Sequence, residues 1–385
     1  MRPVMHPGRR HWLQTLAALS AAPSLGRAAS KADTVNEAAS ASVQEARVLS
    51  FPADHGAHLE ARTEWWYATG WLGEPAAPQL GFQVTFFRSR TGLADNNPSR
   101  FAPRQLLFAH AAVTALATAR HLHDERIVRW SGAPDSLTGR AATADTDVHI
   151  VAWRLHRTSA GWQVAVPARD FTLALQLAPT QRQPLLLQGD AGFSRKGPQE
   201  AQASHYYSAP QLATAGRVRV GGAGAGAEIA TTQPGRAWLD HEWSQEILHP
   251  DAVGWDWIGM NLFDGSALTA FVLRRRDGSV LWAGGSFRAA GAAVQSFQPE
   301  QVRFTAGRRW QSPGSAASYP VQWQIETPAG SFNVRALLDA QELDSRGSTG
   351  TIYWEGLSEL LDAQGRRVGL GYLEMTGYAA PLRLN

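Results

Sequence analysis

The chain has 385 residues, of which 44% are hydrophobic and 18% charged, and it contains 36 Gly, 21 Pro, 15 Trp and no Cys. This length exceeds one ordinary hydrophobic core and favours two domains, while the lack of cysteine excludes disulfides, thiolate metal sites and a cysteine nucleophile. The net charge is +3, but residues 1–28 hold four arginines and no acid, which leaves 32 basic and 33 acidic side chains in the rest. Residues 29–385 are therefore nearly neutral and lack the excess of basic residues that is typical of nucleic-acid binding. We expect no nucleic-acid partner.

The N-terminal segment has the features of an export signal. Arg9 and Arg10 precede a moderately apolar, Ala/Ser-rich run from Leu13 to Leu25, a pattern that resembles a twin-arginine signal. The run is too short and too weakly apolar for a stable membrane span. We therefore expect an export signal at 1–29, a linker at 30–49 and a periplasmic protein. The alternative is an unstructured, slightly basic N-terminus.

From Phe51 onward almost every local pattern indicates β-structure. Strands are predicted at Glu64–Leu72, Leu80–Arg88, Leu106–Thr114, Val148–Leu155, Gly161–Val166, Phe171–Leu177, Ala237–Trp243, Trp255–Leu262, Leu268–Arg275, Val280–Phe287, Val321–Glu326, Phe332–Leu338, Thr351–Glu355 and Gly369–Thr376. Turn signals such as Asp264-Gly265 and Asp277-Gly278 separate them. No long stretch has a 3.6-residue period, so the pattern predicts an all-β sandwich or barrel.

A glycine-rich run at 221–227 divides the chain into two β-rich halves, 50–222 and 230–385. Such a run suits a linker or hairpin loop, and without a G-x-G-x-x-G pattern it predicts no nucleotide site.

The two halves resemble each other weakly. Trp65-Trp66-Tyr67 and Trp255-Asp256-Trp257 are each followed, after a loop, by an apolar strand that ends in arginine. A duplicated barrel would leave this trace, although two aromatic-rich hairpins can also match by chance.

Several familiar chemistries have no motif in the chain. No G-x-S-x-G nucleophile elbow and no P-loop occur. His241-Glu242 begins like a zincin motif, but Gln245 stands where the second histidine is needed. We therefore predict neither a metal site nor a cofactor.

Four clusters combine indole or phenol rings with polar or ionisable groups: Glu64–Gly70, Ser204–Ser208, Trp238–Trp243 and Gly254–Gly259. Strand alternation puts His241 and Trp243 on one face, and Asp240 and Glu242 on the other. An imidazole against an indole can donate a proton, and the ring can stabilise the cation that results. The alternative is a hydrogen-bonded core histidine.

Asp256 lies between two tryptophans and shares its face with Gly254 and Ile258. Desolvation disfavours a carboxylate, so apolar neighbours would raise its pKa and make it a candidate general acid. The alternative is a structural aspartate that accepts indole or backbone N–H bonds.

Taken in order, these clusters carry a family resemblance. Together with Tyr353-Trp354-Glu355-Gly356 and the run from Gly371 to Tyr378, they resemble the lipocalin-like family of bacterial carotenoid hydratase (hydroxyneurosporene synthase) and the AttH-type predicted secreted hydrolases. The resemblance covers about 50–380. It implies an all-β fold of two tandem lipocalin-like antiparallel β-barrels.

The resemblance also implies chemistry, namely acid-catalysed hydration of a terminal alkene in a carotenoid-like substrate. His241 matches the family's proton-handling position, Trp243 its cation-stabilising position, and Asp256 is the nearest carboxylate in a comparable setting. The expected partner is a bulky hydrophobic small molecule. The candidate ligand-binding residues are Trp65, Trp66, Tyr67, Tyr206, Tyr207, Trp255, Trp257, Tyr353 and Trp354.

Two functions therefore remain open: a hydratase-like enzyme and a non-catalytic periplasmic carrier of a hydrophobic ligand. Ester hydrolysis ranks last because the chain has no serine motif. His241 and Asp256 converging on one lumen would favour catalysis, whereas an outward-pointing or salt-bridged Asp256 would favour the carrier.

Overall fold

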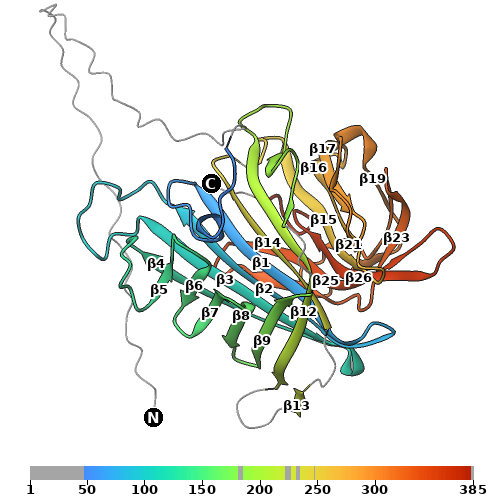
Figure 1. The fold of residues 1–385 in the computed structure, drawn as a ribbon, viewed down its shortest axis with the longest axis horizontal. Helices are drawn as coiled ribbons and strands as arrows, with labels where there is room; N and C mark the ends of the chain where they lie inside the picture. Colours follow the sequence, from blue (N-terminus) through green and yellow to red (C-terminus); the bar gives the residue numbers. More distant parts are fainter. Residues whose placement is uncertain (1–46, 181–184, 222–226, 231–234, 247, 383–385) are drawn as a thin grey trace, which may run out of the picture. The chain divides into compact units, whose positions relative to one another are not determined.

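The computed structural model describes residues 47–180, 185–221, 227–230, 235–246 and 248–382. The expected export signal and nearly all of the expected linker lie outside these residues. The described part consists of antiparallel strands and three short 3-10 helices, η1 (Ala53–His55), η2 (Leu116–Thr118) and η3 (Pro299–Gln301), which confirms the all-β fold (Figure 1). No helix in the described part is long and apolar enough to cross a membrane.

The first sheet has 14 strands, all paired antiparallel. Its main path is β4 (Arg120–Trp130), β3 (Gln105–Ala115), β2 (Ala77–Arg90), β1 (Thr63–Glu74), β14 (Gly235–Ser244), β12 (Ala203–Val220), β9 (Phe171–Pro179), β8 (Gly161–Pro167), β7 (Trp153–Thr158), β6 (Asp147–Ile150) and β5 (Gly139–Ala141). Three short strands also pair with β12, namely β10 (Leu186–Leu187), β11 (Phe193–Arg195) and β13 (Ala227–Ala230). The end strands β4 and β5 contact each other, so the sheet nearly closes into a barrel.

The second sheet has ten strands. Its path is β18 (Gln295–Phe297), β17 (Val280–Arg288), β16 (Ala267–Arg275), β15 (Ala252–Leu262), β26 (Arg367–Met375), β25 (Thr351–Leu361), β23 (Gly330–Ala336), β22 (Gln322–Thr327) and β19 (Arg303–Ala306), with β24 (Glu342–Ser345) paired to β25. A separate hairpin joins β20 (Arg309–Gln311) and β21 (Ser318–Pro320).

The two sheets share one connectivity. In each, the first strand lies between the second and the last strand of its half: β1 between β2 and β14, and β15 between β16 and β26. The two aromatic motifs noted in the sequence occupy these equivalent first strands. The fold is therefore two tandem barrel-like sheets, as expected from the family resemblance.

The change of sheet differs from the expected division at 222–230. β14 pairs with β1 and β12, so the first sheet extends to Ser244 and the second begins at Ala252. The expected strand Val148–Leu155 is in fact two strands, β6 and β7, because Val151 takes a left-handed conformation with φ of 54°. At the turns after β15 and β16, Gly265 and Gly278 have φ of 88° and 84°, which glycine adopts readily.

Apolar residues form one core inside each sheet and a third between them. The core between the sheets includes Tyr67, Trp71 and Trp238 from the first sheet and Trp257 and Tyr372 from the second. It arises because β1 contacts β26, β14 contacts β15, and β2 contacts β25. The outer faces of the central strands therefore pack on one another.

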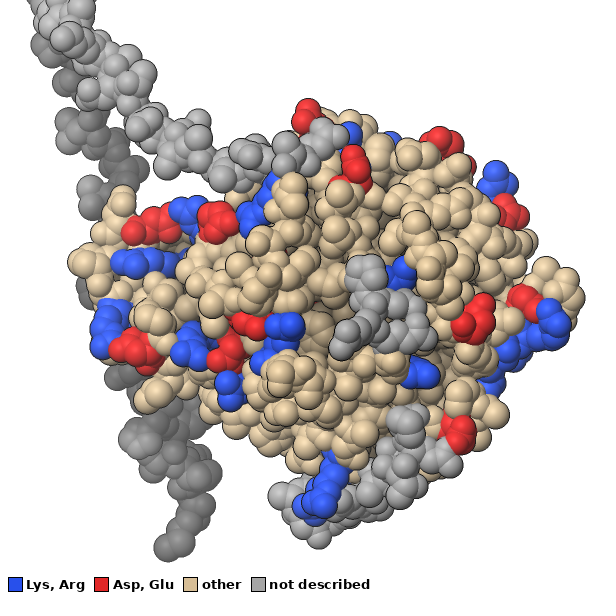
Figure 2. All heavy atoms as spheres, in the orientation of Figure 1, with Lys and Arg blue, Asp and Glu red and all other residues tan. Residues whose placement is uncertain are grey.

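Charged side chains of both signs alternate on the face shown in Figure 2. Several charged side chains are paired, for example Arg154 with Asp147 and Arg157 with Asp145, each at 2.8 Å.

Candidate functional site

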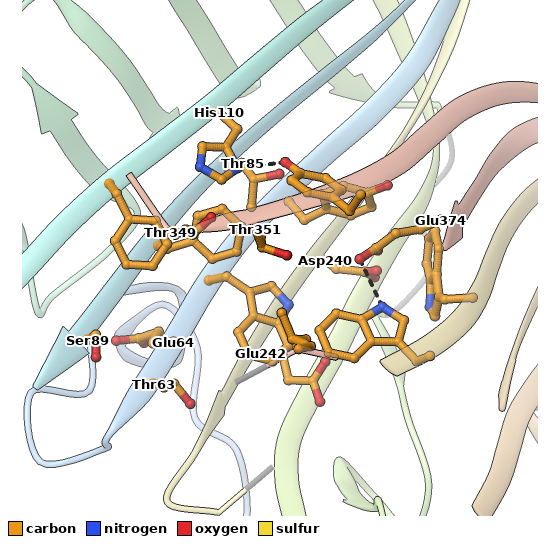
Figure 3. A pocket seen from close by; sticks show the side chains of 18 of the residues that line it. Thr63, Glu64, Thr85, Ser89, His110, Asp240, Glu242, Thr349, Thr351 and Glu374 are labelled. Carbon is orange, nitrogen blue, oxygen red and sulfur yellow. Dashed lines mark hydrogen bonds between the residues drawn. The ribbon is translucent and has the colours of Figure 1, made fainter. Parts of the chain in front are cut away.

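A cavity of about 300 Å³ lies between the outer faces of the two sheets (Figure 3). Its walls come from the central strands of the first sheet and from β15, β16, β25 and β26 of the second. Aromatic and aliphatic side chains make up most of the wall: Trp65, Tyr67, Phe87, Phe108, Tyr206, Leu248, Trp255, Trp257, Phe271, Leu273 and Tyr353. A mostly apolar cavity with a few polar groups is typical of a small-molecule site.

Strand register explains which side chains reach the cavity from the first sheet. On β14, Glu242 lies opposite Trp65 of β1, and Asp240 lies opposite Tyr67. On β12, Tyr206 lies opposite Glu242. Residues directly opposite in neighbouring strands share a face, so these five side chains all point outward toward the second sheet.

Asp240 is a buried carboxyl that accepts three hydrogen bonds. Ser208 Oγ donates at 2.5 Å, Trp238 Nε1 at 2.6 Å and Tyr206 Oη at 2.9 Å. Burial nevertheless raises the pKa of Asp240 to about 7, and the nearby Glu242 adds to the rise.

Glu374 and Glu355 bring two more carboxyls from the second sheet. They lie directly opposite each other on β26 and β25. Burial raises the pKa of Glu374 to about 8, although Trp255 Nε1 donates to its Oε1 at 2.9 Å. Burial and the adjacent Glu374 raise the pKa of Glu355 well above its usual range. Glu374 therefore holds its proton at neutral pH, and burial favours the protonated form of Glu355 as well.

Two basic side chains of the wall, Lys196 and His110, have polar partners. Lys196 Nζ lies 3.1 Å from Glu242 Oε1 and above the rings of Tyr206 and Phe271, 4.7 and 4.4 Å from their centroids. His110 Nδ1 lies 2.6 Å from Tyr353 Oη, and burial lowers the pKa of His110 to about 3, so this imidazole is neutral.

His241 and Trp243 lie on the opposite face of β14, inside the first sheet. His241 Nε2 is 2.9 Å from Glu64 Oε1, its Nδ1 is 3.2 Å from Tyr207 Oη, and its ring stacks on Trp66 with centroids 4.7 Å apart. Burial lowers the pKa of His241, which is completely enclosed. The imidazole therefore does not face the cavity.

Glu64 is the centre of that internal network. His58 Nδ1 lies 2.8 Å from Glu64 Oε1, and Arg88 Nε donates to Glu64 Oε2 at 2.8 Å. His58 Nε2 lies 2.9 Å from Asp54 Oδ1. Burial alone would lower the pKa of His58, but its contacts with Asp54 and Glu64 raise it above the usual value, which favours the protonated imidazole between the two carboxylates.

The same network contains a donor set that can hold a metal ion. The ligand atoms of His58, Glu64 and His241 all lie within 4.8 Å of one another and are buried. However, a protonated His58 and a His241 that donates from Nε2 also satisfy Glu64 without any ion. This donor set was not anticipated from the sequence.

Asp256 lies on the inner side of the second sheet. Its carboxylate is 2.7 Å from Arg274 Nε and accepts from Tyr378 Oη at 2.9 Å, while burial raises its pKa to about 6. The structure therefore does not bring Asp256 and His241 to one lumen, because each lies inside its own sheet. Its partners are a guanidinium and a phenol, not the indole or backbone N–H groups of the structural alternative, and this salt-bridged position is the one expected to favour a carrier.

The nine candidate ligand-binding residues divide by face. Six line the cavity: Trp65, Tyr67, Tyr206, Trp255, Trp257 and Tyr353. Trp66 and Tyr207 point into the first sheet, where Trp66 Nε1 donates to the His55 carbonyl and Tyr207 Oη lies 2.7 Å from His55 Nδ1. Trp354 is buried in the second core and donates to the Asp339 carbonyl.

Sequence reasoning did not select the acids of the cavity. Asp240 stood in a noted cluster, and Glu355 and Glu374 lay within the C-terminal motifs, but none was chosen as a site residue. The available signal was alternation, because Glu355 shares a strand face with Tyr353. Lys196 and His110 had no local signal, since their role depends on contacts with distant strands.

Comparisons with known proteins agree with this architecture. Residues 42–378 match the model of the AttH-like family. A crystal structure assigned as AttH from Nitrosomonas europaea is 44% identical, with a TM-score of 0.77 over 88% of this chain and 99% of that one. No curated protein sequence matches the chain.

Two more distant structures share the fold alone. Kievitone hydratase from Nectria haematococca is 14% identical, with a TM-score of 0.62 over 88% of this chain and 95% of that one. CghA with Sch210972 is 13% identical, with a TM-score of 0.51 over 84% and 89%. With the family model matched over most of its length and a 44% identical structure covering nearly all of the same region, the chain belongs to the AttH-like family.

Proposed function

We propose that the cavity binds a bulky apolar, isoprenoid-like molecule and adds water across one of its carbon–carbon double bonds. One observation carries this proposal: an aromatic-walled cavity holds carboxylic acids that burial keeps protonated near neutral pH. A proton donor beside electron-rich rings is what alkene hydration requires. The expected roles of His241, Trp243 and Asp256 are replaced here by groups that face the cavity.

Glu374 is the proposed proton donor. Its carboxyl is held by Trp255, whereas Asp240 already accepts three hydrogen bonds that favour its ionised form. The Glu374 proton passes to the less substituted alkene carbon, and the π electrons form the new C–H bond. The faces of Trp65 and Trp257 stabilise the carbocation, a water oxygen forms the C–O bond, and the released proton returns to the Glu374 carboxylate.

The test is incubation of the purified protein with lycopene-type and shorter isoprenoids in ¹⁸O-labelled water, followed by mass spectrometry. We expect a labelled alcohol from the wild type and a loss of about 10²-fold or more in Glu374→Gln, the range for a general acid. Ligand quenching of tryptophan fluorescence should persist in that variant, and Glu326→Gln on the surface serves as the charge-matched control. Binding without product in the wild type would contradict the enzyme proposal, and absence of binding would contradict both functions.

A non-catalytic carrier is the second candidate. The salt-bridged position of Asp256 favours it, because the acid that family resemblance nominated is engaged with Arg274. The labelled-water experiment separates the two, since a carrier quenches fluorescence and yields no labelled product.

We also propose export to the periplasm by the twin-arginine route, on the basis of Arg9 and Arg10. Replacement of both by lysine should retain the full-length chain in the cytoplasmic fraction. Unchanged export of that variant would contradict the route.

A further inference from the structure

Two buried polar atoms in the cavity have no hydrogen-bond partner within the described residues. They are Tyr67 Oη, from β1, and Glu355 Oε2, from β25. Both residues are at least nine-tenths buried and line the cavity from opposite sheets. Buried polar atoms are nearly always paired, so an unpaired pair on a cavity wall indicates a group that a ligand supplies.

The Tyr67 ring is held in position by the cavity itself. It meets Trp257 edge to face, with centroids 5.5 Å apart. Its hydroxyl is close enough to Glu355 for that carboxyl to contribute, after burial, to the raised pKa of Tyr67. The two unpaired atoms therefore belong to residues that line one cavity.

The charged groups of the cavity wall disfavour ligands that carry a carboxylate. Asp240, Glu355 and Glu374 present three carboxyls, whereas the cations of the lining are engaged: Lys196 with Glu242, and Arg88 with Glu64. A ligand carboxylate would lose its hydration and gain no cation in return.

We propose that the ligand is an electrically neutral isoprenoid-like molecule with a hydroxyl oxygen, which binds between Tyr67 and Glu355, and that the site rejects carboxylate-bearing lipids. A protonated Glu355 donates to this oxygen, and the phenol of Tyr67 donates or accepts. The inference rests on ligand binding in the cavity as proposed above, but not on turnover. The alcohol that the proposed hydration would form also carries such a hydroxyl oxygen.

The test compares farnesene, farnesol and farnesoate, which share one hydrocarbon chain, by displacement of Nile red at pH 7.5. We expect the wild type to bind farnesol about fivefold more tightly than farnesene and at least tenfold more tightly than farnesoate. Tyr67→Phe should reduce the preference for farnesol over farnesene to about twofold or less. The double variant Glu355→Gln/Glu374→Gln should bind farnesoate about fivefold more tightly, and Glu326→Gln should change none of the three.

The outcomes separate the two proposals. Equal affinity for farnesoate and farnesol, or tightest binding of farnesene, overturns the inference and leaves the cavity as a ligand site. Failure of all three compounds to displace the probe contradicts ligand binding itself. Circular dichroism spectra that match the wild type show that the variants are folded.

Discussion

Glu64 is a single carboxylate that contacts several buried basic side chains inside the first sheet. Its carboxylate contacts the imidazoles of His58 and His241 and the guanidinium of Arg88, and it also accepts from the His58 backbone N–H. Despite full burial, these cationic and hydrogen-bonding neighbours hold the pKa of Glu64 well below its usual range. The group acts as an anion that neutralises buried positive charge.

Replacement of Glu64 by Gln should therefore destabilise the protein by about 3–5 kcal/mol, because Arg88 and His58 lose their counter-charge in the interior. Urea unfolding measures this change. Glu326→Gln on the surface should shift the midpoint by less than about 0.5 kcal/mol. A comparably small effect of Glu64→Gln would show that the network contributes little to stability.

Asp240 differs from Glu64 because burial raises its pKa, whereas the pKa of Glu64 is lowered. Because burial raises its pKa from 3.8 to about 7, the unfolded chain releases this proton at a lower pH than the folded chain. Stability should then fall as pH rises from about 4 to about 7, by up to roughly 4 kcal/mol from this group. Asp240→Asn should remove this part of the slope in urea titrations at several pH values. An unchanged slope would mean that Asp240 ionises normally in the fold.

At the scale of the strand, adjacent residues of β1 lie on opposite faces and in different environments. Trp65 lines the cavity, while Trp66 is buried among the side chains inside the first sheet and stacks on His241. The same division runs along β14, where Asp240 and Glu242 face outward and His241 and Trp243 face inward. Side chains that line the cavity therefore alternate along one strand with side chains that pack inside the sheet.

This alternation provides a matched pair of variants. Trp66→Phe should cost about 2 kcal/mol of stability and leave ligand affinity within twofold, because it removes buried contacts and the bond to the His55 carbonyl. Trp65→Phe should weaken ligand binding about fivefold or more with a smaller change in stability. Nile red binding and urea unfolding check both, and reversed effects would contradict the assignment of faces.

The sequence was sufficient to predict many of the strands and which of their residues share a face, because both follow from a two-residue period, but it did not predict β4 or β12. It could not decide which face is inside, because Trp65 and Trp66 are equally apolar and both faces are covered. It therefore included Trp66, Tyr207 and Trp354 among ligand contacts. The acids of the cavity escaped selection because Glu355 and Glu374 become a pair only through the β25–β26 register.

At the scale of the molecule, the repeated connectivity places equivalent strands on the two sides of the cavity. β1 and β14 face β26 and β15, so each sheet contributes aromatic rings and carboxyls from its first and last strands. The site is therefore complete only when both halves of the chain are present.

Residues 47–246 expressed alone should expose Trp65, Tyr67 and Trp238 to water, since the second sheet covers them in the whole protein. We expect this fragment to self-associate or precipitate, and sedimentation analysis can measure this. The same fragment with Trp65→Ser and Tyr67→Thr should associate more weakly. If the fragment without substitutions is soluble and monomeric, this face does not need the second sheet to shield it from water.

The position of the cavity between two filled barrels has an evolutionary consequence. Packing inside each barrel can remain under constant selection for folding, while substitutions on the shared boundary alter which guest is accepted. Relatives with this architecture can therefore diverge in the ligands they bind while keeping the same scaffold.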